Sequence, residues 1–145
     1  MKFASVLHTL ATGLSAATSA DQICAMTLNA VQHALAVERA SVLLFDEDGV
    51  MRFRAWTGLS DEYRQTVSGH SPWRPDTVNP MPVLVPDVEA APGMDAYLDA
   101  FRHEGIRALA FIPLSAGPRT IGKFMLYWGS PHALDDASLD AARAL

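Results

Sequence analysis

The chain has 145 residues, of which half are hydrophobic and 19% are charged, and its formal net charge is −5. This composition supplies enough apolar side chains for one folded core and excludes a disordered tail. The negative charge and the lack of a cluster of Lys or Arg argue against nucleic acid as a partner.

The apolar runs are about as long as strands and are broken by Gly, Pro or charged residues, so no segment is expected to span a membrane. The N-terminus lacks the basic and apolar pattern of a signal peptide, and we therefore expect a cytoplasmic protein. Cys24 is the one cysteine of the sequence, which excludes an internal disulfide and a cysteine-based zinc site within one chain. Because Cys24 lies on an apolar helical stripe, we expect it to be a small core residue.

Two helices are predicted at the start of the chain. Apolar residues recur at spacings of three and four over residues 3–14, as they do on one face of a helix. Ser19 and Gln22 have the spacing of a capping box, which marks the start of a second helix that ends near Leu35.

A hairpin is predicted next. Residues 39–45 and 51–56 have the β-branched and aromatic content of strands, and residues 46–49 contain the Asp and Gly of a tight turn. Arginines alternate with apolar residues along 51–56, so we expect this strand to lie at an edge of the sheet.

The middle of the chain is predicted to be largely irregular. A short helix is expected over residues 61–67, after which Gly and several prolines between residues 69 and 86 exclude long regular structure. Residues 83–85 are expected to form one short strand within this segment. Residues 95–104 then have the pattern of an amphipathic helix.

The most apolar stretches form a second predicted hairpin. Residues 108–114 and 121–128 are apolar at nearly every position, so both faces of these strands are expected to be covered, and residues 115–119 connect them. Gly105 fits the left-handed end of the preceding helix. Pro113 has no backbone N–H and marks either a strand end or a strand paired on one side.

A last helix is predicted from about residue 135 onward. Neither the first nor the last helix has a capping residue at its outer end, so we expect residues 1–145 to be one domain cut from a longer chain. The predicted order is helix, helix, hairpin, irregular crossover with a strand, helix, hairpin and helix.

This order of elements resembles that of a GAF domain, and so do the stretches 39–46, 85–88, 105–114 and 121–126. The amino-acid sequence of the crossover, over residues 69–87, most resembles that of GAF modules inside bacterial sensor histidine kinases. The fold that this resemblance implies is α+β. It consists of an antiparallel sheet of GAF or PAS type, with the terminal helices packed on one face and a ligand pocket under the crossover on the other.

The resemblance also implies a sensory module without catalysis of its own, excised from a signalling protein that would be a histidine kinase. Such a module binds a small molecule or a partner and passes a change of helix packing to an attached output domain. Ligand pockets are mostly apolar with a few placed polar groups. The candidate ligand-binding residues are Leu43, Phe45, Trp56, Tyr63, His70, Trp73, Tyr97, Phe111 and Tyr127. The sequence identifies neither the small molecule nor a cofactor.

Several other activities are disfavoured by residues that the chain lacks. Bilin-binding members of the family commonly carry a cysteine before a histidine in the crossover helix, where this chain has Ala96 and Tyr97, so no covalent chromophore is expected there. Members that reduce methionine sulfoxide use several cysteines, and the Asn-Lys…Phe…Asp-Glu signature of cyclic-nucleotide binders is incomplete at residues 45–47. The motifs of phosphate loops, nucleophile elbows and zinc proteases are absent, so no catalytic residue is expected.

The mechanism that we expect is a homodimer through the terminal helices. Ligand binding would bias two arrangements of the resulting helical bundle. The apolar stripes that motivate this are Val6, Leu10, Leu14, Leu139 and Leu145.

Two alternatives stay open. One is a ligand-free dimerisation or interaction module, whose pocket would be filled by large side chains such as Trp56, Trp73 and Phe111. The other is a haem or metal sensor through His70. A solvated or backbone-bonded histidine is the expected role at this position, because the neighbours of His70 are loop-forming residues.

Overall fold

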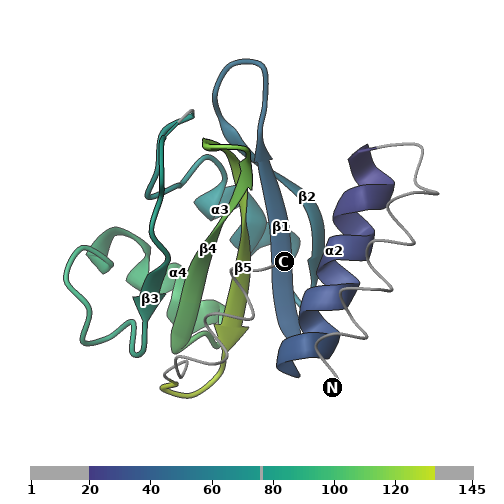
Figure 1. Ribbon diagram of the computed structural model, residues 1–145. Coiled ribbons are helices and arrows are strands. Elements are labelled where there is room, and N and C mark those ends of the chain that lie inside the picture. The colour runs from purple at the N-terminus through teal and green to yellow at the C-terminus, as the bar shows by residue number, and fades with distance from the viewer. Residues whose placement is uncertain (1–19, 76, 133–145) are drawn as a thin grey trace.

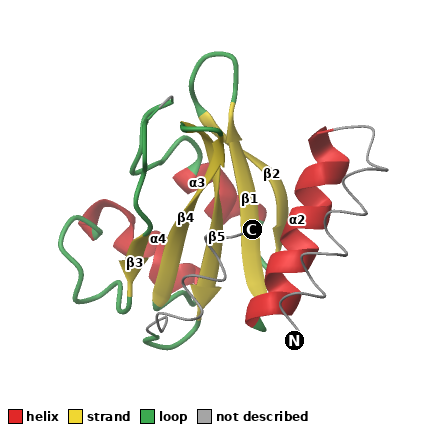
Figure 2. Cartoon of the chain, viewed as in Figure 1, coloured by secondary structure: helices red, strands yellow, loops and turns green. Residues whose placement is uncertain are grey.

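An antiparallel β-sheet forms the centre of the computed structural model, which describes residues 20–75 and 77–132 (Figure 1 and Figure 2). In these residues the sheet has five strands in the order β2-β1-β5-β4-β3. The strands are β1 (Arg39–Phe45), β2 (Met51–Thr57), β3 (Val83–Val85), β4 (Ala108–Ala116) and β5 (Arg119–Trp128). The helical elements are α2 (Ala20–Leu35), α3 (Asp61–Val67), the 3₁₀ turn η1 (Asp95–Tyr97) and α4 (Leu98–Glu104). The predicted α+β class with an antiparallel sheet is confirmed.

The hairpin of β1 and β2 agrees with its prediction, including the turn. The Asp46 carboxylate accepts hydrogen bonds from the backbone N–H groups of Asp48 and Val50, both at 2.9 Å. Gly49 has a φ of 77°, a conformation that glycine adopts readily. In the described part of the chain β2 pairs with β1 alone, so it is the edge strand that the sequence predicted.

The hairpin of β4 and β5 lies inside the sheet, as predicted, because β5 also pairs with β1 and β4 also pairs with β3. Its turn is shorter than the predicted connection of residues 115–119. The two strands remain paired as far as Ala116 and Arg119, which leaves Gly117 and Pro118 as the turn. The φ of 62° at Gly117 makes so tight a connection possible.

Pro113 and Gly105 have the roles expected of them. Pairing of β3 with β4 ends at Phe111, so Pro113 is paired through Lys123 of β5, on one side of its strand. The predicted helix over 95–104 begins as η1 and continues as α4. It ends at Gly105, which has a φ of 77° and donates its N–H to the carbonyl oxygen of Arg102.

Two apolar layers cover the two faces of the sheet. On one face α2 lies against β1 and β2 (Figure 1), and its buried Cys24 and Val31 belong to the same cluster as Val42 of β1 and Phe124 of β5. Cys24 is 4% exposed and is the core residue that was predicted. The predicted helices over 3–14 and from residue 135 lie outside the described residues. No helix in residues 20–75 and 77–132 is both long and apolar enough to cross a membrane.

The second face of the sheet is covered by α3, α4 and the crossover, whose described residues are 68–75 and 77–94. Side chains alternate between faces along a strand, so Leu43 belongs to this layer while its neighbour Val42 belongs to the α2 layer. Phe101 of α4 and Tyr63 of α3 are buried in the second layer. This is the layer in which the sequence placed a ligand pocket.

Candidate functional site

A small cavity lies between the sheet and the elements that cover its second face. Its volume is about 20 Å³, which is room for about one water molecule. The side chains that line it come from the crossover and from every helix and strand between β1 and β5, these two included, except β3. They are Leu43, Phe53, Tyr63, Val67, His70, Tyr97, Phe101, Leu109, Phe111, Lys123, Met125 and Tyr127.

Side chains of β1, β4 and β5 that the strand register aligns form the floor of this cavity. Leu43 of β1 pairs with Lys123 of β5, and Phe111 of β4 pairs with Met125 of β5. Directly paired residues point to the same side of a sheet. These four side chains, from three strands, therefore reach the cavity together.

Aromatic rings form the walls. The His70 ring lies 4.6 Å from the ring of Tyr97 and 5.7 Å from the ring of Phe111, measured between ring centroids. Tyr63 of α3 meets Tyr127 of β5 edge to face at 6.1 Å. Edge-to-face and tilted contacts of this kind hold aromatic rings in defined orientations.

The hydroxyl groups of two tyrosines form a buried hydrogen-bonded row. The Tyr127 hydroxyl lies 2.9 Å from Oγ of Ser41, and the Tyr63 side chain also hydrogen-bonds to that of Tyr127. Burial raises the pKa of both tyrosines above the ordinary value. They therefore present neutral hydroxyl groups, and not negative charges, at the cavity.

Lys123 is the charged residue of this lining. Its side chain is 3% exposed, and its Nζ donates a hydrogen bond to the backbone carbonyl oxygen of His70 at 2.8 Å. The same Nζ lies 4.8 Å from the centroid of the Phe111 ring, within the range of a cation–π contact. Burial lowers the pKa of Lys123 to about 7, because the charged form loses its hydration.

His70 lies inside the fold, and its ring is packed between Tyr97 and Phe111. Burial lowers the pKa of His70, and the nearby charge of Lys123 lowers it further. The described residues contain no group of three or more His, Cys, Asp or Glu side chains arranged to hold a metal ion. Where the sequence predicted a solvated or backbone-bonded histidine, the structure has a half-buried ring in an aromatic wall.

The structure brings six of the nine predicted ligand residues to the cavity: Leu43, Tyr63, His70, Tyr97, Phe111 and Tyr127. The other three lie outside its lining. Phe45 and Trp73 are partly buried against the same apolar cluster. Trp56 is 40% exposed, because it lies on the edge strand β2, where the Arg64 guanidinium stacks on its ring at 4.0 Å.

Sequence reasoning missed the other six lining residues, which are Phe53, Val67, Phe101, Leu109, Lys123 and Met125. Of these, Lys123 is the one with distinctive chemistry. A signal for it exists in the sequence. It is a lysine in the middle of a strand that was predicted to be covered on both faces, where a charged residue is unexpected.

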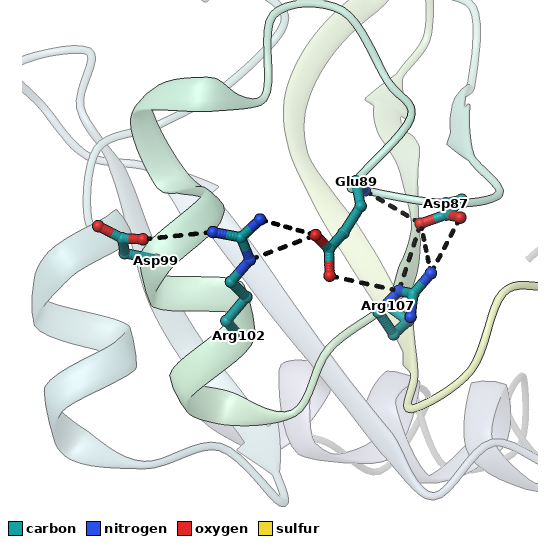
Figure 3. A network of polar contacts seen from close by, with 5 residues as sticks. All are labelled: Asp87, Glu89, Asp99, Arg102 and Arg107. Atoms are coloured by element: carbon teal, nitrogen blue, oxygen red, sulfur yellow. Dashed lines mark hydrogen bonds and ion pairs between the residues drawn. The ribbon is translucent and has the colours of Figure 1, made fainter.

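Ion pairs fasten the crossover to the elements beside it (Figure 3). The Asp87 carboxylate accepts hydrogen bonds from the Arg107 guanidinium, at 3.1 and 3.0 Å from Nη2 to its two oxygens. Glu89 accepts one from Nη2 of Arg102 on α4 at 2.7 Å, and Asp99 lies on the other side of Arg102. These arginines lower the pKa of Asp87 and Glu89 below their ordinary values. Because these groups lie near the surface, the network orients the crossover more than it stabilises the fold.

A second set of polar contacts joins α3, α4 and β1. The Glu104 carboxylate accepts hydrogen bonds from the backbone N–H and the hydroxyl of Ser60, at 2.6 and 2.7 Å. The Arg39 guanidinium donates to the carbonyl oxygens of Glu104 and Gly105, at 2.9 and 3.0 Å. The start of α3 and the end of α4 are thus held to each other and to the sheet, which fixes one end of the roof of the cavity.

A helix on one face of an antiparallel sheet and a lined cavity under an irregular crossover on the other are the features of a GAF or PAS-like fold. The sequence matches the family described as GAF domain over residues 17–145. The chain therefore belongs to the GAF domain family, as its sequence predicted.

Solved structures agree with this assignment. A domain of a protein assigned as a two-component sensor histidine kinase, from Sinorhizobium meliloti 1021, is 41% identical, with a TM-score of 0.79 over 88% of this chain and 85% of that chain. The GAF domain of the cyanobacteriochrome TePixJ is 17% identical, with a TM-score of 0.71 over 90% of this chain and 86% of that one. The GAF domain of a phosphoenolpyruvate-protein phosphotransferase from Coxiella burnetii is 14% identical, with a TM-score of 0.73 over 99% and 88%. At such low identity the last two are similar in fold alone. No curated protein matches the chain.

Proposed function

We propose that this GAF domain is the sensory module of a bacterial sensor histidine kinase and that it binds a small molecule in the cavity beneath the crossover. The observation that carries the proposal is the convergence of aromatic rings, hydroxyl groups and a buried lysine on one cavity. Ligand sites typically combine apolar walls with a few placed polar groups of this kind. The likeness to the S. meliloti kinase domain, at 41% identity, supports a sensor histidine kinase as the parent protein.

The sheet offers a route from this cavity to the helices. Leu43 and Lys123 face the cavity, while their chain neighbours Val42 and Phe124 belong to the cluster that holds α2. Because the sheet is a single layer between the cavity and α2, a ligand that displaces β1 or β5 changes the packing of α2. A ligand shifts the balance between two arrangements by its difference in affinity for them. Homodimerisation through the terminal helices would pass this shift to the output domain.

The size of the cavity limits the ligand. Sites for drug-sized molecules enclose roughly 300–1,000 Å³, whereas this cavity has about 20 Å³. The ligand is therefore either very small or enters by moving the crossover and α4 away from the sheet. A haem or a bilin would need such a movement, so the conformation described here does not fit a haem sensor acting through His70.

A second candidate function is the ligand-free interaction module, and the same small volume favours it. Phe111 is 2% exposed and is one of the side chains of the floor. Trp56 and Trp73, the other side chains expected to fill the pocket, lie outside its lining. In this alternative the second layer is an ordinary core, and its substitution changes stability alone.

A pair of matched substitutions separates these two functions. Val67→Leu adds one methylene group to the lining of the cavity, and Val31→Leu adds the same group to the α2 layer, where Val31 is 1% exposed. The test is a thermal-shift screen of a library of small metabolites, preceded by native mass spectrometry of the purified domain. Sensory binding predicts compounds that raise the Tm of the wild type and of Val31→Leu but not of Val67→Leu. No bound mass, no hit and an undiminished Tm for Val67→Leu would instead favour the ligand-free module.

A further inference from the structure

We infer that the ligand of this cavity is a small anion, a short monocarboxylate that enters when the crossover and α4 move away from the sheet, and that its charge is bound by the ammonium group of Lys123. The inference rests on the proposed function, since it names the chemical class of the molecule that occupies the cavity. It is motivated by a buried cation that has donors to spare and no negative partner.

The ammonium group of Lys123 has more hydrogen-bond donors than the described residues around it accept. An ammonium group has three N–H donors. One of them is used by the carbonyl oxygen of His70, at 2.8 Å, and the ring face of Phe111 at 4.8 Å offers a weaker contact. In the described part of the chain, Nζ has no further hydrogen bond, which leaves two donors for a ligand at the cavity that Lys123 lines.

The charge of Lys123 has no acidic partner among the described residues that line the cavity. The side chains that line the cavity include no Asp or Glu. The titratable groups that face it are Tyr63 from α3, His70 from the crossover, Tyr97 from η1 and Tyr127 from β5. Burial raises the pKa of Tyr63 and Tyr127, which keeps these two hydroxyl groups neutral. A buried charge without a partner is strongly unfavourable. An anionic ligand would supply the missing partner and hydrogen-bond acceptors at once.

A purely structural role for Lys123 explains less. Tying the crossover to β5 through His70 requires one donor, which a neutral side chain could supply without burial of a charge. The hydroxyl groups of Tyr63 and Tyr127 are arranged beside the same cavity, and hydroxyl groups can donate to a carboxylate. A lysine with neutral polar neighbours and no acid is the arrangement expected of an anion site.

The inference makes a specific statement about pH. Burial lowers the pKa of free Lys123 to about 7, so the ammonium form that binds an anion is depleted above that pH. The affinity for a carboxylate, whose own pKa lies near 4, should fall about 25-fold between pH 6.5 and 8.5. A neutral ligand would show no such dependence.

The test is calorimetric or NMR titration of the domain with formate, acetate and propionate, each beside its neutral amide. Three proteins are compared: the wild type, Lys123→Met, and Arg52→Met as a control. Arg52 lies on the edge strand, is paired with Asp46 and does not line the cavity, so Arg52→Met removes the same unit of charge from a side chain outside the lining. Ligands of so few atoms are limited to dissociation constants of roughly tens of micromolar or weaker, so titrations extend to about 50 mM.

The expected result is that at least one carboxylate binds the wild type and Arg52→Met equally, and binds Lys123→Met more than about 10-fold more weakly. The matching amide should not bind. Equal affinity for acid and amide, or unchanged affinity in Lys123→Met, would overturn the anion inference while a small molecule still occupies the cavity. No binding by any of the three acids at pH 6.5 would also overturn it. In that case the proposed function would still be supported by a neutral compound that raises the Tm of the wild type and of Val31→Leu but not that of Val67→Leu.

Discussion

The buried ammonium of Lys123 should make the stability of the protein depend on pH in a way that one substitution removes. The pKa of Lys123 is about 7 in the folded chain, against an ordinary value of 10.5. Between these values the unfolded chain binds more protons than the folded chain, so the free energy of unfolding rises with pH. At 1.36 kcal/mol for each tenfold change in the proton equilibrium, the rise attributable to Lys123 is about 2 kcal/mol between pH 7 and pH 9.

Lys123→Met isolates this contribution, because methionine is close to lysine in length and carries no charge. Urea unfolding of both proteins at pH 7, 8 and 9, without carboxylate buffers, gives the difference in the free energy of unfolding at each pH. We expect the variant to be the more stable protein at pH 7. By pH 9 the free energy of unfolding of the wild type should have risen by about 2 kcal/mol relative to that of the variant. His70 is largely neutral across this range, because its pKa lies below the ordinary 6.5. A difference that does not change with pH would refute the burial of Lys123 in the cavity.

Two further substitutions test the packing around the cavity. Gly122→Ala would place a Cβ 2.2 Å from the carbonyl oxygen of Leu43, so we expect a loss of at least about 2 kcal/mol in urea unfolding; wild-type stability would contradict the register of β1 and β5. Tyr127→Phe removes the hydroxyl that bonds to Ser41 at 2.9 Å and leaves a buried group unpaired. We expect this to lower the free energy of unfolding by about 1–2 kcal/mol, and an unchanged urea midpoint would show that the buried row does not exist.

Local sequence patterns predicted most of the elements, because periodicity, caps and turn residues act over a few positions. The spacing of Ser19 and Gln22 predicted a helix that starts near residue 19, and α2 begins at Ala20 in the described residues, while Gly105 marked the end of α4. The turn between β4 and β5 was predicted too long because Gly and Pro were read as a loop signal, and the pairing of Ala116 with Arg119 depends on the partner strand. Strand pairing is not a local property.

The cavity could be predicted only in part, since its lining depends on which strands are neighbours. Tyr63 and His70 were found because they lie in or beside the irregular segment, but the same reasoning selected Trp73, which lies outside the lining. Trp56 was included on residue type, but the sheet ends at β2, so its ring packs against Arg64 near solvent. Lys123 was passed over because an apolar run was read as a whole. The floor that it shares with Leu43 appears only when β1 and β5 are placed side by side.

The most direct test of the account is the location of a bound molecule. For the compound with the largest thermal shift, isotope-edited NMR can detect contacts between ligand protons and the side-chain protons of the domain. Binding in the cavity predicts contacts with Phe111, His70 and Tyr127, whose side chains line it, and their loss in Val67→Leu. Contacts confined to exposed residues such as Val78 or Ile121 would contradict the assignment of the cavity as the sensory site.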